Sequence, residues 1–157
     1  MHQKIFQISK NPIPKDEYLT EGEYFDNFVG EIADYVMEST DKDENKTIFR
    51  NIPGILYNTE ENTITVENKH AYFAGSYKNF KKQLQILSAI TEEEFCQNHQ
   101  TDLSYHMFLL DEAYNDKYGI YMDDGYNEYG LITLDNFIRN CKNGDTFYLG
   151  AVIDYHV

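Results

Sequence analysis

Apolar side chains recur three and four residues apart between residues 24 and 36, which is the spacing of an amphipathic helix. The stripe consists of Tyr24, Phe25, Phe28, Val29, Ile32, Tyr35 and Val36. Ahead of it, Thr20 and Glu23 form a capping-box pattern, in which each side chain bonds the backbone amide of the other. The pattern predicts a helix of about four turns after Thr20. We expect Phe25, Phe28, Ile32, Tyr35 and Val36 to face the core.

The same spacing predicts a second helix over about 70–90, which Gly75 could interrupt, and favours a helix over a strand at 103–114. Capping residues predict short helices after Thr91 and after Thr133. Expected strands lie at 4–9, 55–57, 64–66, 118–122 and 146–155, and Gly150 could bend the last of them.

These elements do not alternate as regular βαβ units, and this favours the α+β class. At 157 residues with an apolar share of 41%, the chain is large enough for one core and too small for several. We therefore expect a single compact domain over 1–157. It would hold a mixed or antiparallel sheet of about five strands, with three to four helices packed on it.

Composition points to a cytoplasmic protein. The chain has 14 Tyr and 10 Phe but no Trp, and its only cysteines are Cys96 and Cys141. Two cysteines are too few for a disulfide framework, as expected in a reducing compartment. No run of apolar residues is long enough for a signal peptide or a membrane span, so we expect no membrane association.

One cluster has the residue types of a zinc site: Cys96, His99 and His106, at positions i, i+3 and i+10 of a helical stretch. A fourth ligand and a second ligand pair are missing, so we expect no metal and no cofactor there. A nucleophilic pairing of Cys96 or Cys141 with a histidine is disfavoured. Three glutamates flank Cys96, and Cys141 falls near the C-terminal end of a helix, where the dipole opposes a thiolate.

Catalytic signatures are otherwise absent from the sequence, which contains no GxGxxG, P-loop, GxSxG or HExxH motif. A small hydrolase-like enzyme stays open as an alternative, with either a Cys/His site or a carboxylate site beside an apolar segment, such as Asp111-Glu112 or Asp123-Asp124. The stretch from Asp123 to Glu128 resembles a calcium loop superficially but lacks the alternating ligands, so we interpret it as a turn.

Charge is distributed unevenly along a chain whose formal charge is −14. Residues 1–46 and 91–157 carry net charges of −6 and −10, whereas 47–90 carry +2. Lys78, Lys81 and Lys82 are the nearest approach to a basic stripe, too small to bind nucleic acid directly. On the expected first helix, carboxylates three to four residues apart would be spaced roughly 5–6 Å, comparable to phosphates along DNA.

The pattern predicts a non-enzymatic acidic protein that docks a basic partner, such as a nuclease or DNA-binding protein, as an immunity-type or nucleic-acid-mimic inhibitor. It would not bind nucleic acid itself. A self-associating scaffold protein of a mobile element or phage is a further alternative. The expected partner-binding residues are Glu23, Asp26, Glu31, Asp34, Glu38, Asp111, Glu112, Asp123, Asp124 and Glu128.

Overall fold

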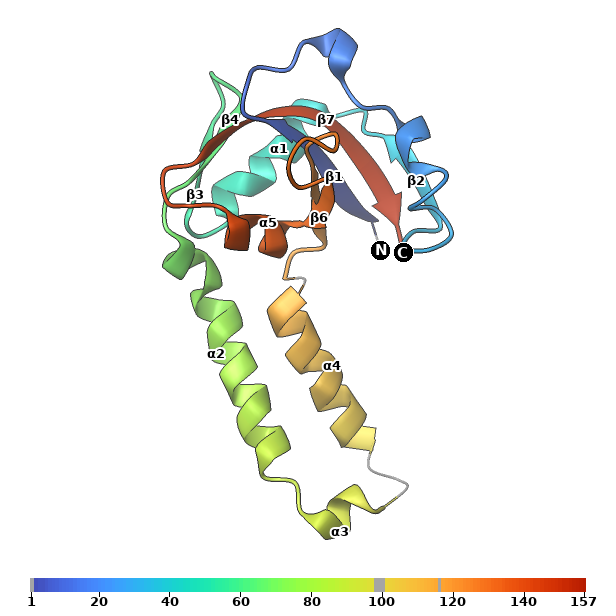
Figure 1. Cartoon of the computed structure of the whole chain (residues 1–157), viewed down its shortest axis with the longest axis vertical. Coiled ribbons are helices and arrows are strands. Elements are labelled where there is room, and N and C mark those ends of the chain that lie inside the picture. The colour runs from blue at the N-terminus through green and yellow to red at the C-terminus, as the bar shows by residue number, and fades with distance from the viewer. Residues whose placement is uncertain (1, 98–100, 116) are drawn as a thin grey trace. The chain divides into compact units, whose positions relative to one another are not determined.

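The computed structural model describes residues 2–97, 101–115 and 117–157 (Figure 1). Contacts within the chain divide it into two compact units. The sheet unit comprises Met1–Tyr72 and Tyr118–Val157, and the helical unit comprises Phe73–Lys117. The presence of a mixed sheet together with helices confirms the α+β class. That both units belong to one domain stays a prediction.

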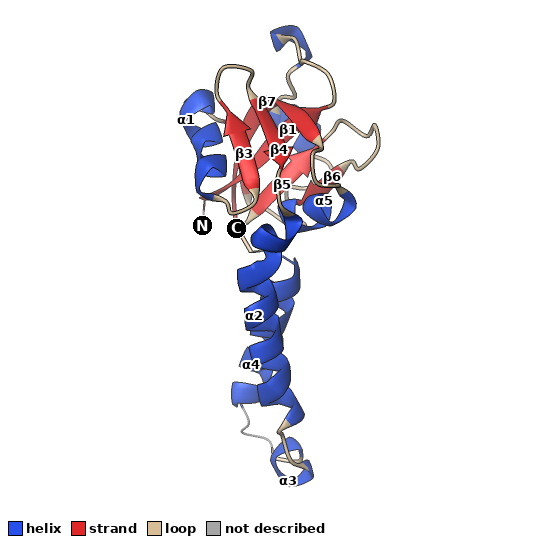
Figure 2. Ribbon diagram, turned by 90° about the vertical axis from the view of Figure 1, so that its left-hand side faces the viewer, coloured by secondary structure: helices blue, strands red, loops and turns tan. Residues whose placement is uncertain are grey.

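Seven strands form the sheet of the described chain, two more than expected (Figure 2). They are β1 (His2–Ser9), β2 (Tyr35–Glu38), β3 (Ile55–Asn58), β4 (Thr63–Val66), β5 (Ile120–Asp123), β6 (Leu131–Thr133) and β7 (Thr146–His156). Their order is β3-β4-β7-β1-β5-β6, and β2 pairs with β7 on the same side as β4. Only the β1–β5 pair is parallel, so the sheet is mixed.

The helices of the sheet unit are short. They are the 3-10 helices η1 (Lys15–Glu17), η2 (Glu21–Tyr24) and η3 (Thr47–Asn51), and the α-helices α1 (Lys42–Lys46) and α5 (Leu134–Asn140). The helical unit contains most of α2 (Lys69–Ser88), followed by α3 (Glu92–Phe95) and α4 (Thr101–Asn115). Thr91 and Glu94 complete the expected capping box of α3, and Thr133 caps α5. In the described residues no helix is long and apolar enough to cross a bilayer.

Strand β1 is buried on both faces, which explains its run of buried residues from Ile5 to Ile8. Ile5 packs on one face in a cluster with Tyr24 and Phe28. Phe6 points to the opposite face, where its ring lies 4.7 Å from that of Phe49. The sheet unit therefore has apolar packing on both sides of a central strand.

The prediction of a long helix after Thr20 is wrong. Its residues form the short η2, then turns, and then strand β2. Gly30 adopts a φ of 90°, which a helix does not permit, and each glycine inside a helix costs about 1 kcal/mol relative to alanine. Thr20 makes no side-chain cap. Pairing of β2 with β7, a contact distant in sequence, therefore decides the local structure.

Candidate protein-binding surface

Residues 21–38 form an acidic segment with six carboxylates and no Lys or Arg. Its backbone is held on the sheet unit by four side chains of one core cluster, Tyr24, Phe28, Ala33 and Val36. Most of the other side chains are exposed, because the buried residues recur at intervals along the segment, while Val29 is partly buried against the same cluster. The buried side chains thus anchor the acidic segment to the core, and most of the side chains between them are accessible to a partner.

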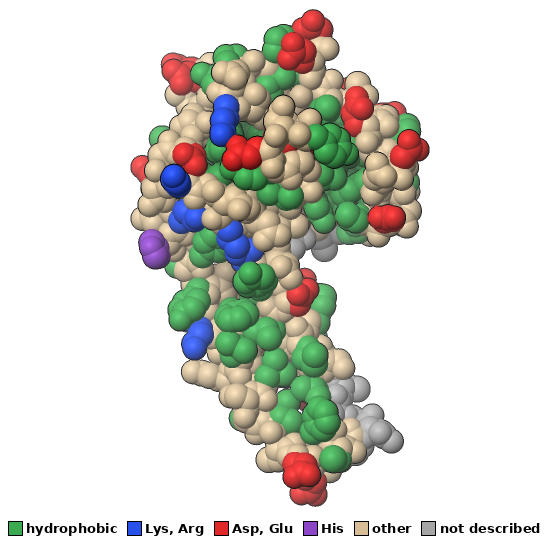
Figure 3. All heavy atoms as spheres, viewed as in Figure 1, with side chains coloured by type: hydrophobic (Ala, Val, Ile, Leu, Met, Phe, Trp, Pro, Cys, Tyr) green, Lys and Arg blue, Asp and Glu red, His purple; other side chains and the backbone are tan. Residues whose placement is uncertain are grey.

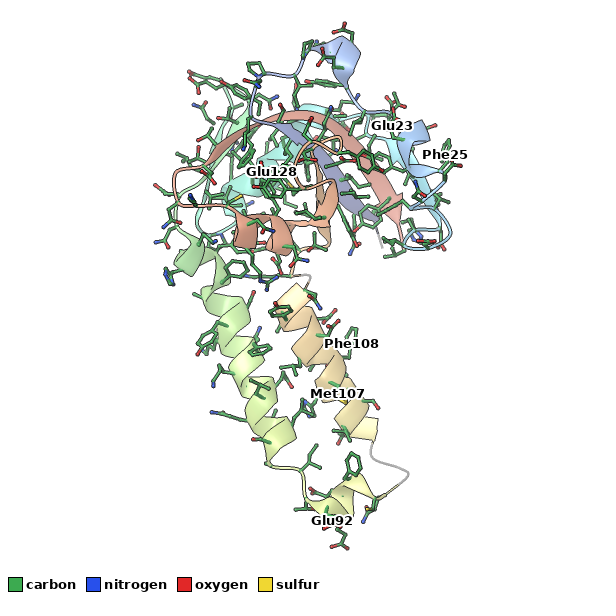
Figure 4. The ribbon with its side chains drawn as sticks, viewed as in Figure 1. Glu23, Phe25, Glu92, Met107, Phe108 and Glu128 are labelled. Atoms are coloured by element: carbon green, nitrogen blue, oxygen red, sulfur yellow. The ribbon has the colours of Figure 1, made fainter. Side chains whose placement is uncertain are left out.

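Apolar and acidic side chains are interleaved on this exposed side. Phe25, Ile32, Tyr35 and Met37 are large apolar residues that are each more than two-fifths exposed. The acids beside them, Glu23, Asp26, Glu31, Asp34 and Glu38, are all exposed. Figure 4 shows Glu23 and Phe25 pointing outward from the segment. Exposed apolar anchors among charges of one sign are typical of a protein-binding surface.

Side-chain contacts fix both ends of the acidic segment. Near its beginning, the hydroxyl of Tyr24 donates to Asp123 over 2.8 Å. Burial, reinforced by the Asp123 carboxylate, raises the pKa of Tyr24, so this hydroxyl remains a donor. Near its end, the Tyr35 ring stacks on His156 at 5.4 Å between centroids, and His156 Nδ1 lies 3.3 Å from Asp34 Oδ2.

The ten expected partner-binding residues do not all lie together. Glu23, Asp26, Glu31, Asp34 and Glu38 belong to the acidic segment, although not to a helix. Asp111 and Glu112 are exposed on α4 of the helical unit. Asp123 and Asp124 are 5% and 8% exposed, so these two offer little charge to a partner. Glu128 is exposed and pairs with Lys10 at 2.8 Å.

The Asp124 carboxylate organises the turn that follows it. It accepts the backbone N–H groups of Asn127, Glu128, Tyr129 and Gly130 at 2.7–3.2 Å. Burial alone would raise the pKa of Asp124, but these amides together hold it below its ordinary value. Its lone pairs are thus occupied by the loop, which confirms the interpretation as a turn.

A pocket of about 240 Å³ lies beside this turn, lined by Ser9, Lys10, Asp124, Glu128 and Tyr129 among others. Its charged groups are already engaged, Lys10 with Glu128 and Asp124 with the loop amides. In Figure 3 the sheet unit shows blue and red side chains close together near its centre. The pocket is a small recess of mixed polar and apolar lining, to which Ile8 and Phe147 also contribute, and none of the groups named here is an activated nucleophile or base.

The two cysteines differ in environment. Cys141 is buried, and desolvation raises the pKa of its thiol to about 12, which suits a structural residue. Cys96, by contrast, is exposed. His99 lies outside the described residues, and His106 Nδ1 lies 2.7 Å from the side-chain oxygen of Gln83. Within the described residues no group of three or more His, Cys, Asp or Glu is placed to hold a metal.

The exposed apolar residues of the acidic segment are what sequence reasoning missed. Phe25, Ile32 and Tyr35 were expected to face the core, and instead they are exposed. Burial alternates at Tyr35, Val36 and Met37, with only Val36 buried, but all three residues are apolar, so the sequence carries no alternation that could have shown this exposure.

Comparisons with protein-family models, with curated proteins and with solved structures found no match for this chain.

Proposed function

We propose that the protein docks a basic protein partner through the acidic segment, residues 21–38. The observation that carries the proposal is the exposure of apolar side chains between carboxylates on a backbone anchored in the core. The carboxylates attract a basic surface and speed association, and the apolar side chains supply contact area that excludes water. Anchoring by Tyr24 and Phe28 lowers the entropy lost on binding.

A site that binds nucleic acid is the basic surface we favour as the target. Nucleases and DNA-binding proteins present clusters of Lys and Arg that recognise phosphates, and a segment with six carboxylates and no cation complements such a cluster. A helical row of carboxylates spaced like phosphates does not support this target, because that helix does not form. The support is the local charge and the exposed apolar anchors.

Charge reversal in the acidic segment tests the proposal. The variant Glu31→Lys/Asp34→Lys/Glu38→Lys would be compared with Glu60→Lys/Glu61→Lys/Glu67→Lys, which changes the net charge equally at exposed positions elsewhere in the sheet unit. In affinity capture from the native host at low and high salt, the first variant should lose the partner and the second should retain it. Binding of the wild-type protein should weaken as salt rises.

Equal capture by both variants would show that the acidic segment is not the docking surface. Tight binding of the wild-type chain to DNA in a mobility-shift assay would contradict the expected repulsion of phosphates.

A further inference from the structure

The helical unit exposes an apolar face that spans two helices. On α2 the face consists of Phe73, Tyr77, Phe80, Leu84 and Leu87, and on α4 of Leu103, Met107, Leu110 and Tyr114. Tyr77, Met107 and Tyr114 are 64%, 57% and 51% exposed. Figure 3 shows hydrophobic side chains gathered along both helices on the viewed side. We call these nine residues the hairpin face.

Contacts between α2 and α4 show that both stripes point to the same side. The rings of Phe80 and Tyr114 lie 6.2 Å apart, joining the two stripes. Between the helices lie polar as well as apolar groups, since Gln83 is buried and its side-chain oxygen accepts from His106 Nδ1 over 2.7 Å. On each helix the stripe is turned by roughly a quarter of a turn from the side facing the other helix. The apolar residues thus do not pack chiefly between α2 and α4.

A second layer is needed to cover this face. Every buried apolar side chain of the described residues belongs to the sheet unit, so the helical unit shows no core of its own. Helices gain most of their stability by packing an apolar face against another element. Two such faces brought together would form a four-helix bundle with the hairpin face inside.

The charges on α2 and α4 favour another copy of this chain as the second layer. Helix α2 carries Lys69, Lys78, Lys81 and Lys82 and no acid, whereas α4 carries Asp102, Asp111 and Glu112 and no Lys or Arg. A chain of −14 repels copies of itself in general, so local complementarity is required for self-association. This requirement is met if the basic α2 of one copy packs on the acidic α4 of the other.

Lys81 and Asp111 border the hairpin face at the same level along the helix axes. Lys81 follows Tyr77 by one turn, and Asp111 follows Met107 by one turn, so each charge lies next to an exposed apolar residue. The Phe80–Tyr114 and Gln83–His106 contacts bracket both positions along the hairpin. The two charges therefore flank the face on different helices at matching levels.

We propose that the protein self-associates through the hairpin face, with α2 of one copy packed antiparallel on α4 of the other. A two-fold axis parallel to the helices produces this arrangement and preserves the height of each residue. It brings Lys81 opposite Asp111 of the partner subunit, twice. A two-fold axis across the helices would instead pack α2 on α2 of the partner subunit, and this brings two basic helices together, which like charge disfavours. The proposal does not depend on the acidic segment.

The test is sedimentation velocity of the full chain over a range of concentrations. The wild-type protein should dimerise reversibly. Lys81→Asp should weaken the dimer by about 10- to 100-fold, because two like-charged pairs replace two opposite ones. Asp111→Lys should act likewise, and Lys81→Asp/Asp111→Lys should restore the dissociation constant to within a few fold.

A pair of tyrosine variants provides the matched control for the apolar contact. Tyr77→Ser should abolish the dimer, whereas Tyr105→Ser should not, since Tyr105 is exposed on α4 outside the hairpin face. Unchanged circular dichroism would show that each variant is folded. A wild-type chain that stays monomeric would overturn the proposal, and so would a dimer insensitive to Tyr77→Ser. Failure of the double charge swap to rescue would exclude the packing of α2 on α4.

Discussion

The side-chain oxygen of Gln7 accepts the backbone N–H of Ala151 at 3.0 Å, where the pairing of β1 with β7 shifts register. The same oxygen accepts the N–H of Leu19 at 3.1 Å, and the Gln7 nitrogen donates to the carbonyl of Glu17 at 3.0 Å. One buried amide thus joins the irregular point of the sheet to the loop that leads into the acidic segment.

Gly150 leaves room for this amide, so Gly150→Ala should destabilise the protein. A Cβ at this position would lie 2.5 Å from the Gln7 oxygen, which would have to move and lose hydrogen bonds. We expect a loss of about 1–3 kcal/mol in the free energy of unfolding, measured by urea denaturation. Gly22→Ala is the control, because the nearest atom to its Cβ would be 3.6 Å away. Equal stability of the two variants would contradict the role of Gln7.

Substitutions of Phe28 and Phe25 distinguish the structural role of the acidic segment from its role in binding. Phe28 is 1% exposed and packs edge-on against Tyr24, Tyr121 and Tyr155, whereas Phe25 is 53% exposed. Phe28→Ala should cost about 3–5 kcal/mol through the cavity it leaves. Phe25→Ala should change stability by less than about 0.5 kcal/mol and yet weaken capture of the partner. Similar losses of stability in both variants would contradict this assignment.

Asp124→Asn should destabilise the turn at neutral pH. The amide lacks one of the acceptor oxygens that bind loop N–H groups, so we expect a loss of about 2–3 kcal/mol. The pKa of Asp124 in the folded protein is held below its ordinary value of 3.8. Its ionised form therefore contributes stability above about pH 4, and this contribution is lost as pH falls through the lowered pKa.

Urea denaturation at pH 7 and at pH 3 measures the effect of Asp124→Asn. The difference in the free energy of unfolding between variant and wild type should be smaller at pH 3. Asp26→Asn, at an exposed position, should show a small effect at both. If this difference in the free energy of unfolding does not change with pH, the charge of Asp124 is not what stabilises the loop.

Excision of the helical unit should leave the sheet unit folded. The chain leaves the sheet unit at Tyr72 and returns at Tyr118, whose rings lie 5.8 Å apart. A Gly/Ser linker of about six residues spans such a gap, replacing residues 73–117. Because the described core lies in the sheet unit, the shortened chain should retain one cooperative thermal transition, as expected of a single domain. A molten chain without such a transition would show that the sheet unit needs the helical unit.

Sequence patterns predicted elements whose local and tertiary preferences agree. The capping box at Thr91 and Glu94, the cap at Thr133 and the long stripe of α2 all formed as expected. Residues 24–36 are a segment for which the sequence pattern predicted the wrong element. Their helical spacing is genuine, but Gly30 weakens the helix, and pairing of β2 with β7 across more than 110 residues supplies bonds that no local pattern contains.

The candidate surface was predictable in charge and not in shape. A count of carboxylates identified Glu31, Asp34 and Glu38, which are exposed as expected. It could not show that the amides of the following loop would enclose Asp124, because that depends on the backbone of the turn. Nor could it show that Phe25 and Ile32 would be exposed, since the helical interpretation turned both toward the core.

The position of β7 has a consequence for the order of folding during synthesis. It pairs with β1, β2 and β4, so it supplies the hydrogen-bonding partner for strands made much earlier. Until β7 leaves the ribosome, Ile5, Phe6 and Val36 lack neighbours that bury them, and a nascent chain with exposed apolar strands is prone to aggregate. Chaperone demand should therefore be concentrated in the interval before β7 emerges, and nonsense mutations ahead of Thr146 should yield insoluble fragments.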